Sequence, residues 1–288
     1  GQRVPPAAAR PLEGPFALHA NLTQVHALYT AGEALVVHAT GLPYRERSHF
    51  DAQQVLESGG TRPYELSTGW LARALQATQQ RGLAINTAVP LVLRGPGETD
   101  TWAPSVLPEP SMDLVDRLQA LYASDPALEQ ALARARALRV LELGGWDTHT
   151  NQAAPNGALA NNLGTLDAAV GALREALTTP AADNAWRHTV VVVATEFGRT
   201  VAANGTQGTD HGTGGAALVM GGAVRGGRVL ADWPGLAPGD RHEGRDLRIT
   251  TDLRAVFRTV LGQHLGVPSR ALDEGVFPGS AGLRDLPL

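Results

Sequence analysis

The most apolar stretch of the chain lies between Thr189 and Ala194 and holds four consecutive valines at positions 190–193. Such a run predicts a strand buried on both faces, as strands of parallel sheets covered by helices are. The clearest helix precedes it, over Ala158 to Leu177. Its apolar stripe consists of Leu163, Leu166, Val170, Leu173 and Leu177, which share one helix face. A buried strand that follows an amphipathic helix predicts an α/β fold.

The rest of the chain continues the alternation of helix and strand. Apolar spacing predicts helices over 21–31, 112–138 and 251–265, the second with a break at Asp125-Pro126, and a strand over 34–37. Residues 84–93 contain Pro90 and are expected to form an edge strand or an extended loop. Residues 1–20 are rich in proline and alanine, which predicts an irregular leading segment. The alternation predicts a three-layer α/β/α sandwich, with residues 1–288 in a single domain.

Composition excludes several classes of protein. The 288 residues are 43% hydrophobic, enough to supply a full core, and the net charge is -4 with scattered arginines, so no nucleic acid partner is expected. The chain has no cysteine, which excludes a disulfide scaffold, a thiolate zinc site and a cysteine nucleophile. Any metal must therefore be held by oxygen and imidazole ligands. No run of about 18 apolar residues is present, so no membrane span is expected.

Three polar clusters border apolar runs. Residues 144–149 (Gly-Gly-Trp-Asp-Thr-His) follow the run at 139–143, and residues 195–199 (Thr-Glu-Phe-Gly-Arg) follow the valines. Residues 208–212 (Gly-Thr-Asp-His-Gly) precede the run at 216–220. Ligand-binding groups of open α/β sheets gather beyond the carboxyl ends of strands. Carboxylates and imidazoles placed there favour a divalent metal site.

Each cluster, taken alone, has a second interpretation. Asp147 and His149 lie two residues apart, so they either bind one ion together or form a turn with an exposed histidine. Glu196 either binds a cation or pairs with Arg199. Asp210 and His211 lie in a glycine-rich loop that either approaches a ligand closely or is a surface turn. The three clusters together favour the metal site.

Ser48 and Asp51 resemble the start of a helix, because a serine can accept a hydrogen bond from a free N–H group there. At such a position Ser48 is either a helix cap or a nucleophile that a nearby metal deprotonates. The Gly-x-Ser-x-Gly elbow of serine hydrolases is absent, and so are the glycine-rich nucleotide motifs.

Four motifs in order resemble the bacterial DUF1501 proteins, a group within the alkaline phosphatase and sulfatase superfamily. They are residues 47–51 (Arg-Ser-His-Phe-Asp), 144–149, 196–199 and 208–212. The likeness extends to 221–222, 226–227, 232–236 and 250–254. It implies an alkaline phosphatase-like sandwich with a mainly parallel central sheet and a metal-assisted site for a small phosphate or sulfate ester. Family members often carry twin-arginine signals, so the resemblance implies a periplasmic or secreted protein. Without such a signal the protein would be cytoplasmic.

The resemblance also implies roles for single residues. Asp147, His149 and His211 would hold one divalent ion, with zinc, manganese and calcium as the candidates. Glu196 and Ser48 would face a second ion, and Asp210 would either bind metal or orient His211. The ion would polarise the ester and activate Ser48 or a bound water. Arg199 or Arg47 would stabilise the developing charge.

The chain departs from the family pattern at its start, at Glu196 and before residue 139. The family usually opens with an apolar strand and a glycine-rich motif whose Asp serves the second ion, and we expect that this upstream first strand is lost here. Many superfamily members have an Asp-His pair where Glu196 stands. The stretch between Leu128 and Arg139 is shorter than the family pattern leads us to expect before the Trp-Asp-Thr-His motif. These departures favour an alternative, a catalytically degenerate exported binding or assembly protein. A further alternative is a one-metal hydrolase that uses water, with Ser48 only a helix cap.

Overall fold

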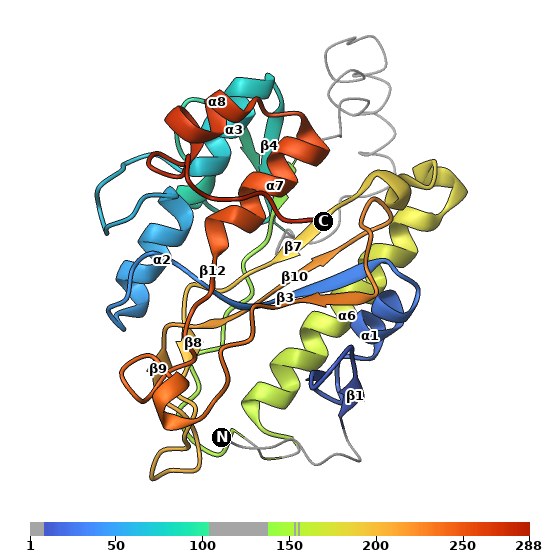
Figure 1. The fold of residues 1–288 in the computed structure, drawn as a ribbon. Coiled ribbons are helices and arrows are strands. Elements are labelled where there is room, and N and C mark those ends of the chain that lie inside the picture. The colour runs from blue at the N-terminus through green and yellow to red at the C-terminus, as the bar shows by residue number, and fades with distance from the viewer. Residues whose placement is uncertain (1–8, 104–137, 153, 155) are drawn as a thin grey trace, which may run out of the picture.

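The described residues of the computed structural model are 9–103, 138–152, 154 and 156–288. They form an α/β fold with several sheets, which confirms the predicted class (Figure 1). The central sheet has the strand order β11-β3-β10-β7, and β12 also pairs with β3. Its strands are β3 (Ala34–Gly41), β7 (Val191–Val193), β10 (Gly215–Met220), β11 (Arg228–Leu230) and β12 (Thr251–Asp252).

The central sheet is mixed, whereas a mainly parallel sheet was expected. Strand β3 pairs in parallel with β11 and β12, but β10 runs antiparallel to both β3 and β7. The reason lies in the connection from β7 to β10, which contains the antiparallel pair β8 (Gly198–Arg199) and β9 (His211–Gly212). This hairpin reverses the chain, whereas a parallel neighbour requires a crossover, usually through a helix.

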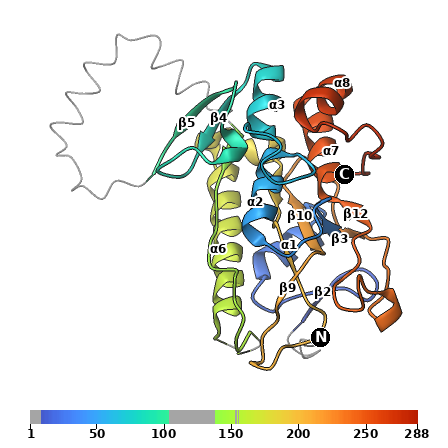
Figure 2. The ribbon, with the colours of Figure 1, turned by 90° about the vertical axis from the view of Figure 1, so that its left-hand side faces the viewer.

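Helices cover both faces of the central sheet (Figures 1 and 2). Leu35 and Val37 of β3 pack into a core formed with α2 (His49–Ser58), α3 (Trp70–Thr78) and α7 (Leu253–Leu265). Ala34, on the opposite face, packs into a second core with α1 (Thr23–Thr30) and α6 (Ala158–Thr178). Successive residues of a strand point to opposite faces, so β3 divides the two cores.

The valine run forms β7, but it is only half-buried, which corrects the prediction of a strand buried on both faces. Val190 and Val192 pack against the first core, while Val191 and Val193 pack against the second. Among the described strands, β7 pairs only with β10 and therefore lies at the edge of the central sheet. Its position at an edge therefore explains the remaining exposure.

A second sheet has the order β5-β4-β6 and only parallel pairs. Its strands are β4 (Arg81–Ala84), β5 (Glu98–Thr101) and β6 (Leu138–Val140). Of the two alternatives for 84–93, the structure has the loop and not the edge strand: β4 ends at Ala84, and a 3-10 turn, η2 (Leu91–Leu93), begins after Pro90. Proline has no N–H to donate to a ladder, so a turn suits this position better than a strand.

The predicted helices at 21–31, 158–177 and 251–265 are confirmed as α1, α6 and α7, although Thr251 and Asp252 belong to β12. Asp252 caps α7, and Gly266 ends it in the left-handed conformation. The helix predicted over 112–138 lies outside the described residues up to 137, and Leu138 begins β6. The leading segment contains a short ladder of β1 (Arg10–Pro11) and β2 (Ala17–Leu18).

The remaining short elements are η3 (Pro180–Ala182), η4 (Ala185–His188), η5 (Pro238–Asp240), α8 (Ser269–Ala271) and η6 (Leu272–Val276). Within the described ranges, no helix has the length and apolar character needed to cross a bilayer.

Candidate metal centre

Asp147, His149 and His211 converge on one point. Oδ1 of Asp147 lies 2.7 Å from Nε2 of His149 and 2.5 Å from Nε2 of His211. One ligand atom from each residue lies within 4.8 Å of the others. Asp147 and His149 come from the segment after β6, whereas His211 begins β9. The two histidines thus meet the carboxylate from segments distant in the sequence.

Arg199 holds these segments together. It is the residue paired with His211 in the β8–β9 ladder. Its guanidinium donates hydrogen bonds to the carbonyls of Trp146, at 2.5 Å, and Thr209, at 3.2 Å. It also lies 3.7 Å from Oδ1 of Asp147. Arg199 therefore links both sides of the centre and leaves a positive charge beside the carboxylate.

A turn at residues 204–208 supports His149. The carbonyl of His149 accepts hydrogen bonds from the amide of Asn204, at 3.0 Å, and the hydroxyl of Thr206, at 2.9 Å. Oδ1 of Asn204 accepts from the N–H of Gly208 at 2.9 Å. A Cβ at position 208 would lie 2.0 Å from the carbonyl oxygen of His149. Only glycine allows this close approach.

Both histidines have an acceptor near the ring nitrogen that faces away from Asp147. Nδ1 of His211 lies 3.4 Å from the carbonyl oxygen of Arg47, and Nδ1 of His149 lies 3.7 Å from Oδ1 of Asp210. Metal-binding histidines commonly donate their second N–H to a carbonyl or carboxylate, which fixes the tautomer and the ring. Two imidazoles and one carboxylate also suit zinc or manganese. The residues present therefore fit a divalent ion.

Electrostatics favour the ionised form of Asp147. Hydrogen bonding from His211, supported by His149, lowers the pKa of Asp147, so its carboxylate is ionised at neutral pH. Burial lowers the pKa of Arg199, although the charges of Asp147 and Asp210 oppose that effect. The side chains of Asp147 and His149 are 47% and 41% exposed, against 17% for His211. A solute can therefore approach the centre from the side of Asp147.

Asp210 lies beside the centre but outside the three converging residues. It was expected to bind metal or to orient His211, yet its carboxylate contacts His149 instead. Its pKa is lowered mainly by a hydrogen bond from Asn204, which donates to Oδ1 at 3.2 Å. The geometry thus places Asp210 beside His149.

Glu196 also lies apart from the three residues. Its Oε1 is 3.2 Å from Nδ1 of His49, the first residue of α2. The pairing with Arg199 that the sequence suggested is absent among the described side chains, where Glu196 contacts His49 instead. Burial and the charges of Glu57 and Glu196 raise the pKa of the neighbouring Glu142.

Ser48 is the cap of α2, as its position in the sequence predicts. Its hydroxyl accepts a hydrogen bond from the N–H of Asp51 at 3.4 Å. Both sequence neighbours of Ser48 lie near His211. The carbonyl of Arg47 faces Nδ1 of His211, and the ring centroids of His49 and His211 are 5.9 Å apart. Ser48 therefore lies beside the centre whatever its chemical role.

Arg47 uses its guanidinium elsewhere. It donates to Oδ2 of Asp246 at 2.9 Å and to Oε2 of Glu243 at 2.5 Å. The hydrogen bond to Glu243 is the main reason that the pKa of Arg47 is raised. These two carboxylates anchor Arg47. Among the described residues, the carboxylate nearest to the guanidinium of Arg199 is that of Asp147, at 3.7 Å.

Residues 116–276 match the model of a protein family described as "Protein of unknown function (DUF1501)". The chain belongs to the DUF1501 family. The DUF1501 match contains Asp147, His149, Glu196, Arg199, Asp210 and His211, while Arg47 and Ser48 lie upstream of it. Neither a search of curated proteins nor a search of solved structures found a match.

Sequence reasoning gave no role to three residues that build this DUF1501 centre. His49 binds Glu196, Asn204 supports both His149 and Asp210, and Phe197 packs its ring between Arg199 and His211. Only Asn204 carries a local signal, because Asn-Gly is typical of a tight turn. The contact of His49 with Glu196 depends on how α2 meets the segment after β7, and that of Phe197 with His211 depends on the pairing of β8 with β9, which no local pattern encodes.

Proposed function

We propose that the chain is a metal-dependent hydrolase of phosphate or sulfate esters. The observation that carries this proposal is the convergence of Asp147, His149 and His211, with an acceptor behind each histidine. The helices on both faces of the central sheet support the finer fold proposal, an alkaline phosphatase-like three-layer sandwich. The resemblance to the alkaline phosphatase and sulfatase superfamily supplies the substrate class.

Zinc, manganese or, with added oxygen ligands, calcium would supply Lewis-acid polarisation of the ester oxygen. Asp147 contributes an ionised carboxylate, and its negative charge attracts the cation. His149 and His211 present Nε2 toward the same point, and Asp210 and the carbonyl of Arg47 hold the two rings in that orientation.

Ser48 is the proposed nucleophile. Its hydroxyl oxygen would attack phosphorus or sulfur while the bond to the ester oxygen breaks, and the hydroxyl proton would pass to the departing alcohol. The N-terminus of α2 favours negative charge at this oxygen as its proton is lost. Water would then release the acid and restore the hydroxyl.

Arg199 is the proposed charge-stabilising residue. Its guanidinium lies 4.8 Å from the centroid of the Phe197 ring and beside Asp147. Guanidinium groups match the oxygens of phosphate and sulfate, and fixed donors of this kind stabilise charge that develops in the transition state. Arg47 is less suited to this role because Asp246 and Glu243 already bind it.

The experiment measures hydrolysis of an aryl phosphate and an aryl sulfate by the protein loaded with each of the three metals. We expect turnover of at least one ester, a loss of about 100-fold or more in Arg199→Gln, and loss of activity in Asp147→Asn. Asp285→Asn is the matched control, because Asp285 is exposed, and it should retain full activity. No turnover with any metal, or full activity in Asp147→Asn, would reject the hydrolase.

One observation favours the second candidate function, a catalytically degenerate exported binding or assembly protein. Glu196 is bound by His49 rather than directed at Asp147, so the centre has three converging ligands instead of a set for two ions. This candidate would bind metal and a partner but would hydrolyse neither ester. The family resemblance supports a periplasmic or secreted location for both candidates, which fractionation of the source cells would test.

A further inference from the structure

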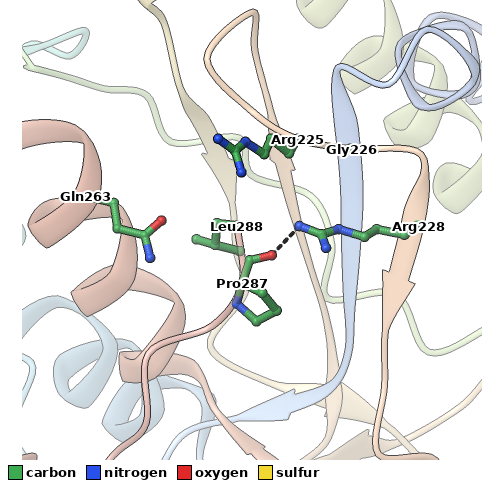
Figure 3. Close-up of a pocket in the computed structure, with 6 residues that line it drawn as sticks. All are labelled: Arg225, Gly226, Arg228, Gln263, Pro287 and Leu288. Carbon is green, nitrogen blue, oxygen red and sulfur yellow. Dashed lines mark hydrogen bonds between the residues drawn. The ribbon is translucent and has the colours of Figure 1, made fainter.

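A cavity lies where β11 begins, against Pro287 and Leu288 (Figure 3). It has a volume of about 460 Å³ and is lined by Arg225, Gly226, Arg228, Gln263, Pro287 and Leu288. This volume falls within the roughly 300–1,000 Å³ of small-molecule sites. Arg228 pairs with Leu35 near the start of β3, whereas Gly215, just after His211, pairs with Thr40 near its end. The cavity and the metal centre are thus separated by most of the length of β3.

The lining carries two positively charged side chains and no acidic side chain. Among the described residues, no acidic side chain lies within ion-pair distance of Arg225 or Arg228. Arg174, Arg254 and Arg258, by contrast, each contact a carboxylate at 2.8 Å or less. Glu13 accepts a hydrogen bond from the backbone N–H of Val229, the residue after Arg228, and forms no ion pair with either arginine of the lining.

The two guanidiniums also have unused donors. Arg228 donates one N–H to the carbonyl of Pro287, but its Nε is buried without a hydrogen-bond partner. Arg225 is exposed and forms no side-chain hydrogen bond within the described part of the chain. Buried donors are almost always satisfied in folded proteins. Nε of Arg174 and Arg258 is unsatisfied in the same way, so the donors that distinguish this cavity are the N–H groups of the exposed Arg225.

The loop that carries both arginines is held firmly in place. The N–H of Gly226 donates to the carbonyl of Gly32 at 2.7 Å, and that of Gly227 donates to the carbonyl of Ala34 at 2.8 Å. A Cβ at position 226 would lie 2.2 Å from the carbonyl oxygen of Ala34. This contact fixes the loop against β3. Arg225 and Arg228 are thus anchored at their backbones before any ligand arrives, which reduces the entropy lost on binding.

We propose that this cavity binds a small dianionic oxyanion. Two guanidiniums without acidic partners supply the positive charge, and their planar N–H groups match the oxygens of phosphate, sulfate or a pair of carboxylates. The amide of Gln263 adds a polar group to the lining, while Pro287 and Leu288 provide an apolar wall. The site is independent of the metal centre and of the hydrolase proposal.

Calorimetric titration of the chelator-treated full chain tests this site at constant ionic strength. The probes are inorganic phosphate, sulfate and succinate, with chloride as the monovalent control. We expect one equivalent of at least one dianion to bind at about millimolar concentration or below, and chloride to bind far more weakly. Preference for phosphate and sulfate over succinate would identify a tetrahedral ligand, and the reverse preference would identify a dicarboxylate.

Three variants connect the binding to the cavity. Arg225→Gln should weaken binding at least tenfold, and because Arg225 is exposed this variant should fold. Arg62→Gln, which removes one charge from a side chain that is 80% exposed, is the matched control and should bind normally. Asp147→Asn should also bind normally, because it alters only the metal centre. Equal binding by wild type and Arg225→Gln, loss of binding in Asp147→Asn, or no preference for dianions over chloride would overturn the proposal.

Discussion

Nε2 of His211 lies 2.5 Å from Oδ1 of Asp147, although 64 residues separate them in the sequence. The contact joins the segment after β6 to the start of β9. It depends on supports that are themselves not ligands, namely Arg199 and the turn at 204–208. Changes in those supports should therefore weaken metal binding even though they remove no ligand.

Gly208→Ala tests the turn. The new Cβ would meet the carbonyl oxygen of His149 at 2.0 Å, so the two segments must separate. We expect metal affinity to fall about 10-fold or more, as it does when groups that orient ligands are altered. Gly205→Ala is the matched control, because its Cβ would have no atom within 4 Å. Isothermal titration with zinc should show the difference, and equal affinities would contradict this role for the turn.

Ser48 can be tested for two roles at once. Ser48→Ala removes the cap of α2 and should lower the free energy of unfolding by about 1 kcal/mol. Ser48→Asn keeps an acceptor for the N–H of Asp51 but has no hydroxyl, so it should retain most of that stability. Denaturant unfolding measures this effect. If Ser48 is the nucleophile, both variants lose ester hydrolysis; activity that survives in Ser48→Asn would leave only the cap.

The pair of Arg47 and Asp246 should matter for stability. The Asp246 side chain is 0% exposed, so Arg47→Ala leaves a buried carboxylate without its closest cation. We expect a loss of about 2–3 kcal/mol in unfolding free energy, less than for a wholly buried pair because Arg47 is 25% exposed and Arg245 remains 3.6 Å from Asp246. The double variant Arg47→Met, Asp246→Leu should recover much of the loss. A double variant no more stable than Arg47→Ala would contradict this explanation.

His38 should make stability depend on pH. It contacts the rings of Phe16 and Trp233, which also contact each other, and its Nδ1 is buried without a partner among the described residues. Burial lowers its pKa below the usual 6.5. The unfolded chain therefore binds more protons between the folded-state pKa and 6.5, so stability is complete above that window and falls as the pH drops through it.

His38→Phe keeps a ring in this place but cannot titrate. Its thermal midpoint should fall less than that of wild type between pH 8 and pH 5.5. Burial also lowers the pKa of His264, so part of the dependence should remain. Identical pH profiles for wild type and His38→Phe would contradict the assignment to His38.

Local patterns predicted most of the elements, because the signals are local. Ser48 caps α2, Gly266 ends α7, and the apolar stripe of α6 marks its length. Sheet pairing was harder to predict. The antiparallel direction of β10 follows from the β8–β9 hairpin, and the edge position of β7 follows from which strands pair with it. Neither feature has a signature within a few residues.

The candidate site shows the same division. The spacing of Asp147 and His149 was compatible with both facing one point, because alternate residues of an extended segment share a face, but it did not exclude a turn with an exposed histidine. The pairing of Glu196 with His49 was not predictable, since it depends on the end of β7 meeting the start of α2. The contact of Asp210 with His149, where one with His211 was expected, depends on how the loop at 204–210 folds back on the segment after β6.

The central claim is that Asp147, His149 and His211 hold a divalent ion. Its most direct test is elemental analysis of the purified protein beside the double variant Asp147→Ala, His211→Ala, each after incubation with zinc, manganese or calcium and removal of free metal. We expect close to one equivalent of metal in the wild type and almost none in the variant. No metal in the wild type, or equal metal in both proteins, would contradict the account.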